Sequence, residues 1–383
     1  MTAQFFGSIL VGLIVSALLF LPLLVWQYRR YGRFDALRML WTTAGFVYAT
    51  AIVAFTVFPL PEFTDGYCSA HGTRPLLDPL RFPRELVELV RSQGPRAVIG
   101  DGLVWEFVLN IVLFVPFGLI VRRVMEWPRG TVLAAALGTS LLIELTQLTG
   151  NWGLAPCAYR FADTTDLLTN TTGAVAGLGL AAITPRLLST KAHLFAHRER
   201  ARPVTRGRRG LGMVLDCWFL VLAAVLGGTA GSTLFTLAQS GPDGALSPEQ
   251  YLALERTIVT GAWIAALGVI VVPAVIGTGA SLGQRTVYLA PVAKNGSRVR
   301  LLARALTVHG AMVTALFCGF PSALLVLPLG AAALLAVAVD PRGLSCLLTG
   351  CLLRDARQPA SGAVADGPGT GAAPTRDPVG ATR

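Results

Sequence analysis

The chain carries little charge. Of its 383 residues, 14% are Asp, Glu, Lys or Arg and 53% are hydrophobic, whereas soluble domains average roughly 25% charged residues. This shortage excludes a soluble globular domain, a nucleic-acid-binding domain and a disordered chain. Lysine is almost missing, since Lys191 and Lys294 are the two lysines among 32 basic residues. We attribute the excess of arginine to a GC-rich bacterial genome, so the net charge of +11 indicates topology rather than chemistry.

Long apolar runs account for the composition. A transmembrane helix needs ~20 largely apolar residues, and the predicted spans are 5–27, 39–60, 105–121, 131–150, 165–185, 211–237, 256–277, 305–320 and 321–340. The last two form one stretch interrupted by Gly319 and Pro321, which is either a hairpin or one span with a packed helix. We predict an all-α, polytopic integral membrane protein of about nine transmembrane helices, five in the first half and four in the second.

The distribution of basic residues predicts the orientation. Cytoplasmic loops of membrane proteins are enriched in Lys and Arg. With the N-terminus outside and the C-terminus in the cytoplasm, 25 of the 32 basic residues fall on cytoplasmic segments. The same layout predicts four parts. They are a membrane domain over 1–190, a basic, helix-poor cytoplasmic linker over 191–204, a second membrane domain over 205–356 and a disordered cytoplasmic tail over 357–383.

Polar side chains interrupt three spans of the first half. Such residues are costly in a bilayer and commonly mark functional sites. Asn110 lies one turn after Glu106, and at 1.5 Å per residue it lies at about the depth of Glu144 below the outer surface. The predicted ligand-binding residues are Asn110, Glu144, Gln147, Arg160, Asp163, Asp166 and Asn170. Two structural alternatives stay open: Asp163 can be a helix cap, and a lone buried Glu144 can be an interhelical strut.

These residues resemble the VanZ-like family over roughly residues 40–185. The resemblance rests on three motifs in order: N-x-x-x-F-x-P-x-G from Asn110, E-x-x-Q from Glu144, and R-x-x-D-x-x-D-x-x-x-N-x-x-G from Arg160. One departure is Thr165, where relatives often carry a second Asp. The family is associated with low-level resistance to teicoplanin-type glycopeptides. The resemblance therefore implies an envelope role for a multi-pass protein of the bacterial plasma membrane.

The second half, over about 205–356, resembles the RDD family. The family is named for one arginine and two aspartates. Arg209 and Asp216 match the arginine and the first aspartate, and the segment Ser281 to Arg285 matches a loop of the family. Cys346 stands where the family has its second aspartate. A buried Asp needs a partner, and we expect Arg209 to reach Asp216. Some members of this family are linked to ion transport, so the resemblance implies that function as an alternative.

The positions of two cysteines and two glycines predict a disulfide and a close contact between helices. Cys68 and Cys157 both fall on predicted outside loops, where a disulfide can form, and we expect this bridge to hold the 61–104 loop over the polar residues. Gly173 and Gly177 are four residues apart, a spacing that lets membrane helices approach closely. We expect no metal and no cofactor, because the sequence has no CxxC pair, no Walker loop and no His-rich metal spacing; we interpret His193 and His197, at i, i+4 in the basic connector, as solvated surface residues.

Three functions remain open from the sequence. The first is binding of a lipid-linked envelope precursor or glycopeptide-related head group, without catalysis. Five arginines of the 61–104 loop would favour an anionic ligand there; they are Arg74, Arg81, Arg84, Arg91 and Arg96. The second is an enzyme acting on an envelope lipid, with Glu144 as the candidate catalytic base. The third is ion transport coupled to Glu144 or Asp216. The lipid bilayer is the expected partner in each case, and nucleic acid in none.

Overall fold

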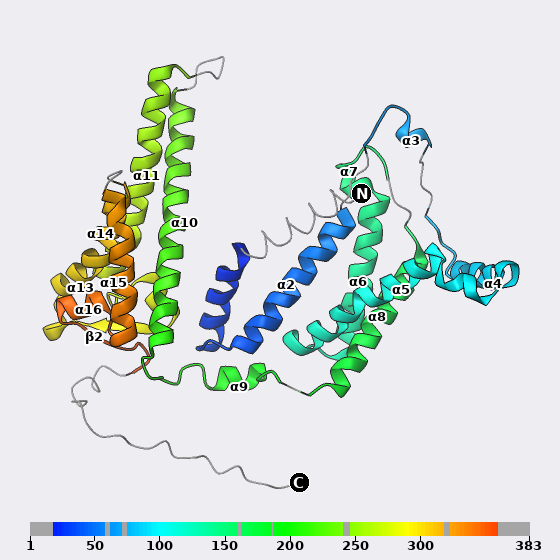
Figure 1. Ribbon diagram of the computed structural model, residues 1–383, viewed down its shortest axis with the longest axis horizontal. Coiled ribbons are helices and arrows are strands. Elements are labelled where there is room, and N and C mark those ends of the chain that lie inside the picture. The colour runs from blue at the N-terminus through cyan, green and yellow to red at the C-terminus, as the bar shows by residue number, and fades with distance from the viewer. Residues whose placement is uncertain are drawn as a thin grey trace, which may run out of the picture. The chain divides into compact units, whose positions relative to one another are not determined.

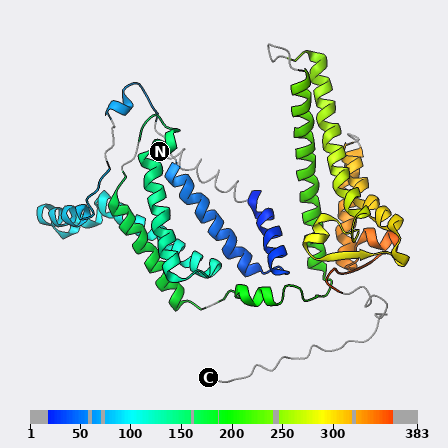
Figure 2. The same cartoon turned by 180° about the vertical axis from the view of Figure 1, so that it is seen from behind.

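The computed structural model describes residues 18–57, 62–70, 75–158, 162–185, 187–239, 246–317 and 322–358. The chain forms two compact units, Met1–Arg198 and Glu199–Arg383, so the change of unit falls inside the segment predicted as a linker. The two units are described separately below (Figures 1 and 2). The predicted tail lies outside the described residues from position 359 onward.

Six helices of the described residues are long and apolar enough to cross a membrane, so this is a multi-pass membrane protein. They are Ala36–Ala54, Gly102–Met125, Arg129–Leu148, Arg206–Gln239, Pro248–Val275 and Arg298–Phe317. Two further predicted runs coincide with α8 (Thr164–Ile183) and the shorter α15 (Val326–Val339). Most of the first run lies outside the described residues, although 18–31 are helical. The total of nine spans and the orientation therefore stay predictions.

In the first unit, α5 (Gly102–Ile120) packs lengthwise on α8, while α2 (Ala36–Val57) and α6 (Arg129–Leu148) pack beside them. Glycines allow the contact between α5 and α8. A Cβ atom at Gly118 would collide with the carbonyl oxygen of Ala174, and one at Gly173 would collide with that of Ile111. Gly177 meets the carbonyl of Val115 in the same way. The two backbones therefore touch, as the small-residue spacing predicts.

Three predicted cytoplasmic segments meet at one end of the first unit. Arg38 is 1% exposed, and its guanidinium donates to the carbonyl oxygens of Val124 at 2.9 Å and Ser189 at 2.7 Å. It also pairs with Glu126 at 3.3 Å, which neutralises its charge. One buried cation thus joins the start of α2, the π-helical turn η2 (Val121–Met125) and the segment before α9 (Lys191–Ala196). The linker was predicted to be poor in helix, but it begins with the helix α9, whose N-terminus is capped by the side chain of Thr190.

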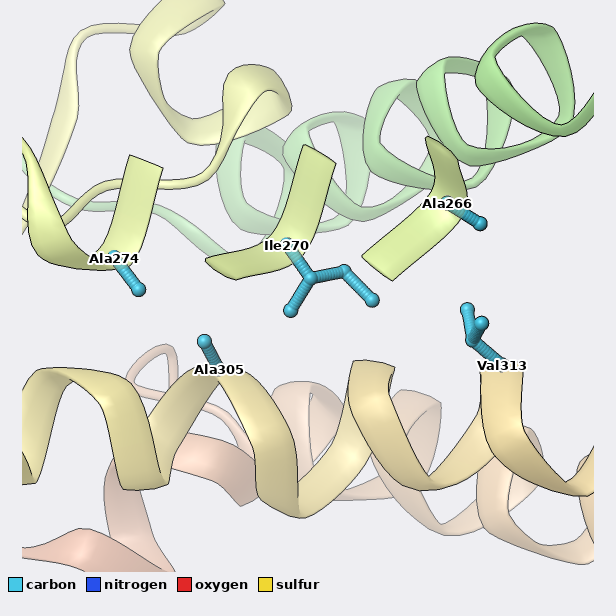
Figure 3. Close-up of a cluster of buried hydrophobic side chains, with 5 residues drawn as sticks. All are labelled: Ala266, Ile270, Ala274, Ala305 and Val313. Atoms are coloured by element: carbon cyan, nitrogen blue, oxygen red, sulfur yellow. The ribbon is translucent and has the colours of Figure 1, made fainter. Parts of the chain in front are cut away.

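The second unit is built on two long antiparallel helices, α10 (Arg206–Gln239) and α11 (Pro248–Val275). Gly227 and Gly261 meet at the contact of their backbones. On the other side of α11 lies a continuous helical segment formed by α13 (Arg298–Ala305), the π-helical turn η4 (Leu306–Gly310) and α14 (Ala311–Phe317). Small and branched side chains form the core between them, as Figure 3 shows for Ala266, Ile270, Ala274, Ala305 and Val313.

After α14, η5 (Ser322–Leu325) leads into α15, which contacts both α14 and α10. This packing suits the hairpin interpretation of 305–340. The remaining elements of the unit are short. They are α12 (Leu282–Thr286), β1 (Leu289–Val292), η3 (Lys294–Gly296), α16 (Leu344–Thr349) and β2 (Leu352–Asp355), with β1 and β2 paired antiparallel.

A buried carboxylate anchors β2 to the start of α10. Asp355 is fully buried, and its Oδ2 atom lies 2.7 Å from both Arg208 Nη2 and Arg357 Nη2. Burial alone would raise the pKa of Asp355, but the hydrogen bonds from Arg357 and the charge of Arg208 lower it from 3.8 to about 2. The carboxylate therefore stabilises the fold at neutral pH by about 2 kcal/mol.

We expect Gly173→Ala to destabilise the first unit by about 1–3 kcal/mol, because the added methyl group collides with backbone that cannot rotate away. Thermal unfolding of the detergent-solubilised chain measures this loss. The matched control is Gly179→Ala on the same helix, where a Cβ meets nothing within 4 Å. That variant should be neutral or slightly stabilising. Equal unfolding temperatures for the two variants would contradict the glycine contact.

We expect Asp355→Asn to cost about 3–5 kcal/mol at pH 7, because it leaves two arginines without their shared counter-charge. Since the folded pKa of Asp355 is depressed, its contribution is complete above pH 4 and is lost as the pH falls through about 2. Unfolding of the solubilised chain against pH tests both statements. Asp340→Asn is the control, because Asp340 pairs with Arg342 in the same i, i+2 spacing but at an exposed position, where an ion pair contributes about 0–1 kcal/mol.

Candidate ligand-binding site

A cavity of about 960 Å³ opens in the first unit between α4 (Arg81–Gln93), α5, α6 and the start of α8. This volume is at the upper end for pockets that hold small ligands. Phe114, which forms a buried cluster with Ala136 and Ala174, lines the cavity. The polar residues that line it are Arg81, Glu85, Glu106, Asn110, Glu144, Gln147, Asp163, Thr165, Asp166 and Asn170. Six of the seven predicted ligand-binding residues are therefore brought together, and the seventh, Arg160, lies outside the described residues.

Side-chain hydrogen bonds across helices fix the positions of the amides. Asn110 on α5 donates from Nδ2 to Oδ1 of Asp166 on α8 at 2.7 Å. Asn170, one turn further along α8, donates from Nδ2 to the hydroxyl of Ser140 on α6 at 2.9 Å. Its Oδ1 atom is buried and has no hydrogen-bond partner in the part of the chain that the structure describes. Because Asn170 lines the cavity and is 4% exposed, that oxygen is an acceptor suited to a ligand.

Glu144 holds the entry to α8. Its Oε2 atom accepts the backbone N–H of Asp163 at 2.9 Å, and the residue is 6% exposed. Asp163 is the N-cap of α8, where its side chain accepts the N–H of Thr165 at 2.7 Å. Both structural alternatives left open by the sequence are thus present: Asp163 caps the helix and Glu144 braces two helices, while both also line the cavity.

The helix α4 contributes Arg81, one of the loop arginines expected near the ligand, and Phe82, which the sequence did not indicate as part of the site. Phe82 stacks on Phe107 of α5 with ring centroids 3.8 Å apart, and Arg81 Nη1 lies 3.6 Å from Asp163 Oδ2. Arg81 also donates to Glu85 at 2.8 Å, a bond that raises the pKa of Arg81 above its usual value. The signal in the sequence was the helical spacing of Phe82, Leu86 and Val90 within the loop between two spans.

Two links hold the predicted outer segments over this end of the helices. Cys68 and Cys157 form a disulfide with their Cα atoms 5.8 Å apart, the pair expected from the sequence. Leu76 forms a parallel β-bridge with Asp163, in which Leu76 N–H donates to Ala162 O and Thr164 N–H donates to Leu76 O. The chain between 75 and 80 is thereby attached to the N-terminus of α8.

The charge of the lining is acidic. Five carboxyl groups face the cavity, from Glu85, Glu106, Glu144, Asp163 and Asp166, against the single guanidinium of Arg81 among its described lining residues. The expectation that arginines of the 61–104 loop favour an anionic ligand stays a prediction; of the four described loop arginines, Arg81 lines this cavity. Arg84, by contrast, pairs with Asp78 and is largely exposed. In the described part of the chain, no three His, Cys, Asp or Glu side chains are grouped to hold a metal ion.

The predicted pair of the second unit forms no ion pair within 4.0 Å, although the charge of Asp216 acts on Arg209. Asp216 accepts the hydroxyl of Ser281 and the N–H of Gly283, both at 2.7 Å. Among the described residues, the basic side chain within 4.0 Å of its carboxylate is that of His309, whose Nε2 lies 3.9 Å from Oδ2, and not that of Arg209. The reason is that the turn before α12 supplies Asp216 with neutral donors, which satisfy the carboxylate without the arginine.

Comparison with known proteins supports the family resemblance of the first unit. No curated protein and no solved structure matches the chain. The comparisons give no support to the RDD resemblance of residues 205–356. Residues 45–185, which contain α5, α6 and α8 and most of the cavity lining, match the VanZ/LLP1 family.

Proposed function

We propose that the first unit is a receptor in the bacterial plasma membrane for the head group of an envelope amphiphile, which it binds in the acidic cavity. The observation that carries the proposal is the excess of acceptors: five carboxyl groups line the cavity with one guanidinium. Such a lining favours hydrogen-bond donors and positive charge. Sugar hydroxyls and ammonium groups have both properties, whereas phosphate and carboxylate groups would be repelled.

The walls suit the apolar part of the same ligand. Leu103, Phe107 and Leu113 line the cavity beside the acidic groups, so a molecule with a polar head and an apolar tail can satisfy both surfaces. Teicoplanin-type glycopeptides are amphiphiles of this class, and a lipid-linked envelope precursor would fit with its sugars, and not its phosphate, in the cavity. Binding such a molecule would give a host low-level protection from glycopeptides, in keeping with the resistance associated with VanZ-like proteins.

Catalysis and transport have weaker support in the geometry. A general base must reach a proton of the substrate, but Glu144 Oε2 already accepts the N–H of Asp163. An ion-coupling acid must exchange its ion, but Asp216 is held by Ser281 and Gly283. Neither contact favours an enzyme or a transporter over a binding protein.

Removing one cavity charge should weaken binding of an amine-bearing glycopeptide. We expect Glu106→Gln to reduce teicoplanin binding to the chain in nanodiscs by about tenfold, since a hydrogen bond to a charged group contributes about 1.5–3 kcal/mol. Glu88→Gln is the matched control, because Glu88 lies on α4 outside the lining residues. Teicoplanin susceptibility of a host expressing each variant at equal level gives the cellular readout. Binding unaffected by Glu106→Gln, or lost equally in both variants, would refute the proposal.

Two substitutions of Glu144 distinguish a structural role, in which Glu144 braces α6 against the start of α8, from a role as a catalytic base. A brace tolerates Glu144→Gln, because the amide oxygen can still accept the Asp163 N–H, and fails in Glu144→Ala, which leaves that N–H without its acceptor. A base fails in both variants, since an amide cannot take a proton at neutral pH. We expect teicoplanin protection close to wild type in the Gln variant and a clear loss in the Ala variant. Equal loss in two well-expressed variants would instead support catalysis.

A further inference from the structure

A second cavity lies in the first unit, at the other end of the same helices. The acidic cavity is lined by the first half of α5, the end of α6 and the start of α8, whereas this one is lined by η2 after α5, the start of α6 and the end of α8. Its volume of about 410 Å³ is in the range of pockets that hold small ligands. The two cavities have no described lining residue in common, so each can bind a ligand independently of the other.

The lining of this second cavity is basic. Among the described lining residues, three guanidinium groups face one carboxylate, that of Glu126. The guanidinium groups belong to Arg122, Arg123 and Arg129. The carboxylate is already balanced, because Glu126 Oε1 lies 3.3 Å from the buried guanidinium of Arg38 and accepts the backbone N–H of Lys191 at 2.8 Å. Within 4.0 Å of the three guanidinium groups there is no carboxylate of a described residue, so the cavity presents uncompensated positive charge to a ligand.

Hydrogen bonds hold two of these guanidinium groups in place and leave donors over. Arg123 Nη2 donates to Ala181 O at 2.6 Å and to Thr184 Oγ1 at 2.9 Å, at the end of α8. Arg122 Nη1 donates to Trp127 O at 2.7 Å. The other guanidinium nitrogens of both arginines donate to no residue that the structure describes. Arginine N–H groups bind phosphate oxygens in pairs, and a guanidinium that is already held in place loses less side-chain entropy when it does so.

The basic cavity lies where two membrane-crossing helices end. One such helix ends at Met125 and the next begins at Arg129, so the arginines lie at the level where phospholipid head groups meet the hydrocarbon region. Apolar side chains adjoin them, because Leu178 and Leu188 line the cavity, and Ile183, near the same end of α8, is 79% exposed. A ligand can therefore place a negative group among the arginines and an apolar chain along α8.

We propose that this cavity binds the phosphate group of an anionic phospholipid from the predicted cytoplasmic leaflet. Basic pockets between membrane helices bind such head groups on the cytoplasmic side. In a zwitterionic phospholipid, an ammonium group offsets the attraction of the phosphate to the arginines, so the cavity selects the anionic lipid. The site is separate from the acidic cavity and does not depend on what that cavity binds.

Competition between two lipids is the first test. The full chain in detergent is incubated with equal amounts of phosphatidylglycerol and phosphatidylcholine of matched acyl chains, and native mass spectrometry counts the lipids that stay bound. We expect phosphatidylglycerol to bind in excess, and the excess to shrink as the salt concentration rises, because salt screens the charges. Inorganic phosphate at the concentration of the lipid should not displace phosphatidylglycerol, because it lacks the apolar part. Equal binding of the two lipids, or displacement by phosphate, would overturn the proposal.

Removing two charges of the cavity locates the binding. The double variant Arg122→Gln, Arg129→Gln should bind phosphatidylglycerol roughly thirtyfold more weakly, since each basic residue beside anionic lipid contributes about fivefold. Arg300→Gln is the matched control, because Arg300 is exposed in the first turn of another membrane-crossing helix and lies outside the cavity. If the double variant does not fold, Arg129→Gln alone, which changes an exposed side chain, should weaken binding about fivefold. Wild-type affinity in a folded variant, or an equal loss in Arg300→Gln, would overturn the assignment to this cavity.

Discussion

The close approach of α5 and α8 is the contact on which the first unit depends. Gly118, Gly173 and Gly177 let the two backbones touch, and without this approach Asn110 could not reach Asp166 at 2.7 Å. In a bilayer the helices gain little from burying apolar surface, so backbone proximity and interhelical hydrogen bonds must hold them together. The same glycines that let the helices pack therefore position the polar groups of the cavity, which links the stability of the fold to the geometry of the site.

The spacing of residues predicts much of this site. Polar side chains at i, i+4 and i, i+7 must share a helix face, and their equal depth in three spans predicts that Asn110, Glu144 and Asp166 meet. Partners, however, depend on rotation of each helix about its axis, which hydropathy does not determine. Arg209 and Asp216 lie on the same helix, α10, so their expected pairing fails for another reason: hydroxyl and backbone donors of Ser281 and Gly283 occupy the carboxylate.

Amphipathic segments between spans are harder to predict than the spans themselves. The helix α4 is a short helix with charged residues throughout and offers no long apolar run. It contributes to the site through the stacking of Phe82 on Phe107 and through the contact of Arg81 with Asp163. Basic residues raise a related difficulty. Counting arginines predicts on which side of the membrane each loop lies. It does not distinguish the largely exposed Arg84 from Arg38, which is 1% exposed and joins three segments of the chain.

The departure at Thr165 bears on what the cavity can do. Where VanZ-like relatives often carry an acid, this chain has a hydroxyl whose Oγ1 is buried and has no partner among the described residues. The backbone N–H of Thr165 is bound by Asp163, so the side chain is not needed to cap α8. A hydroxyl keeps one hydrogen-bonding position at the cavity wall while it removes one negative charge. With Thr165 in this place, Asp166 has no acidic neighbour at position 165, and its carboxylate accepts the hydrogen bond from Asn110.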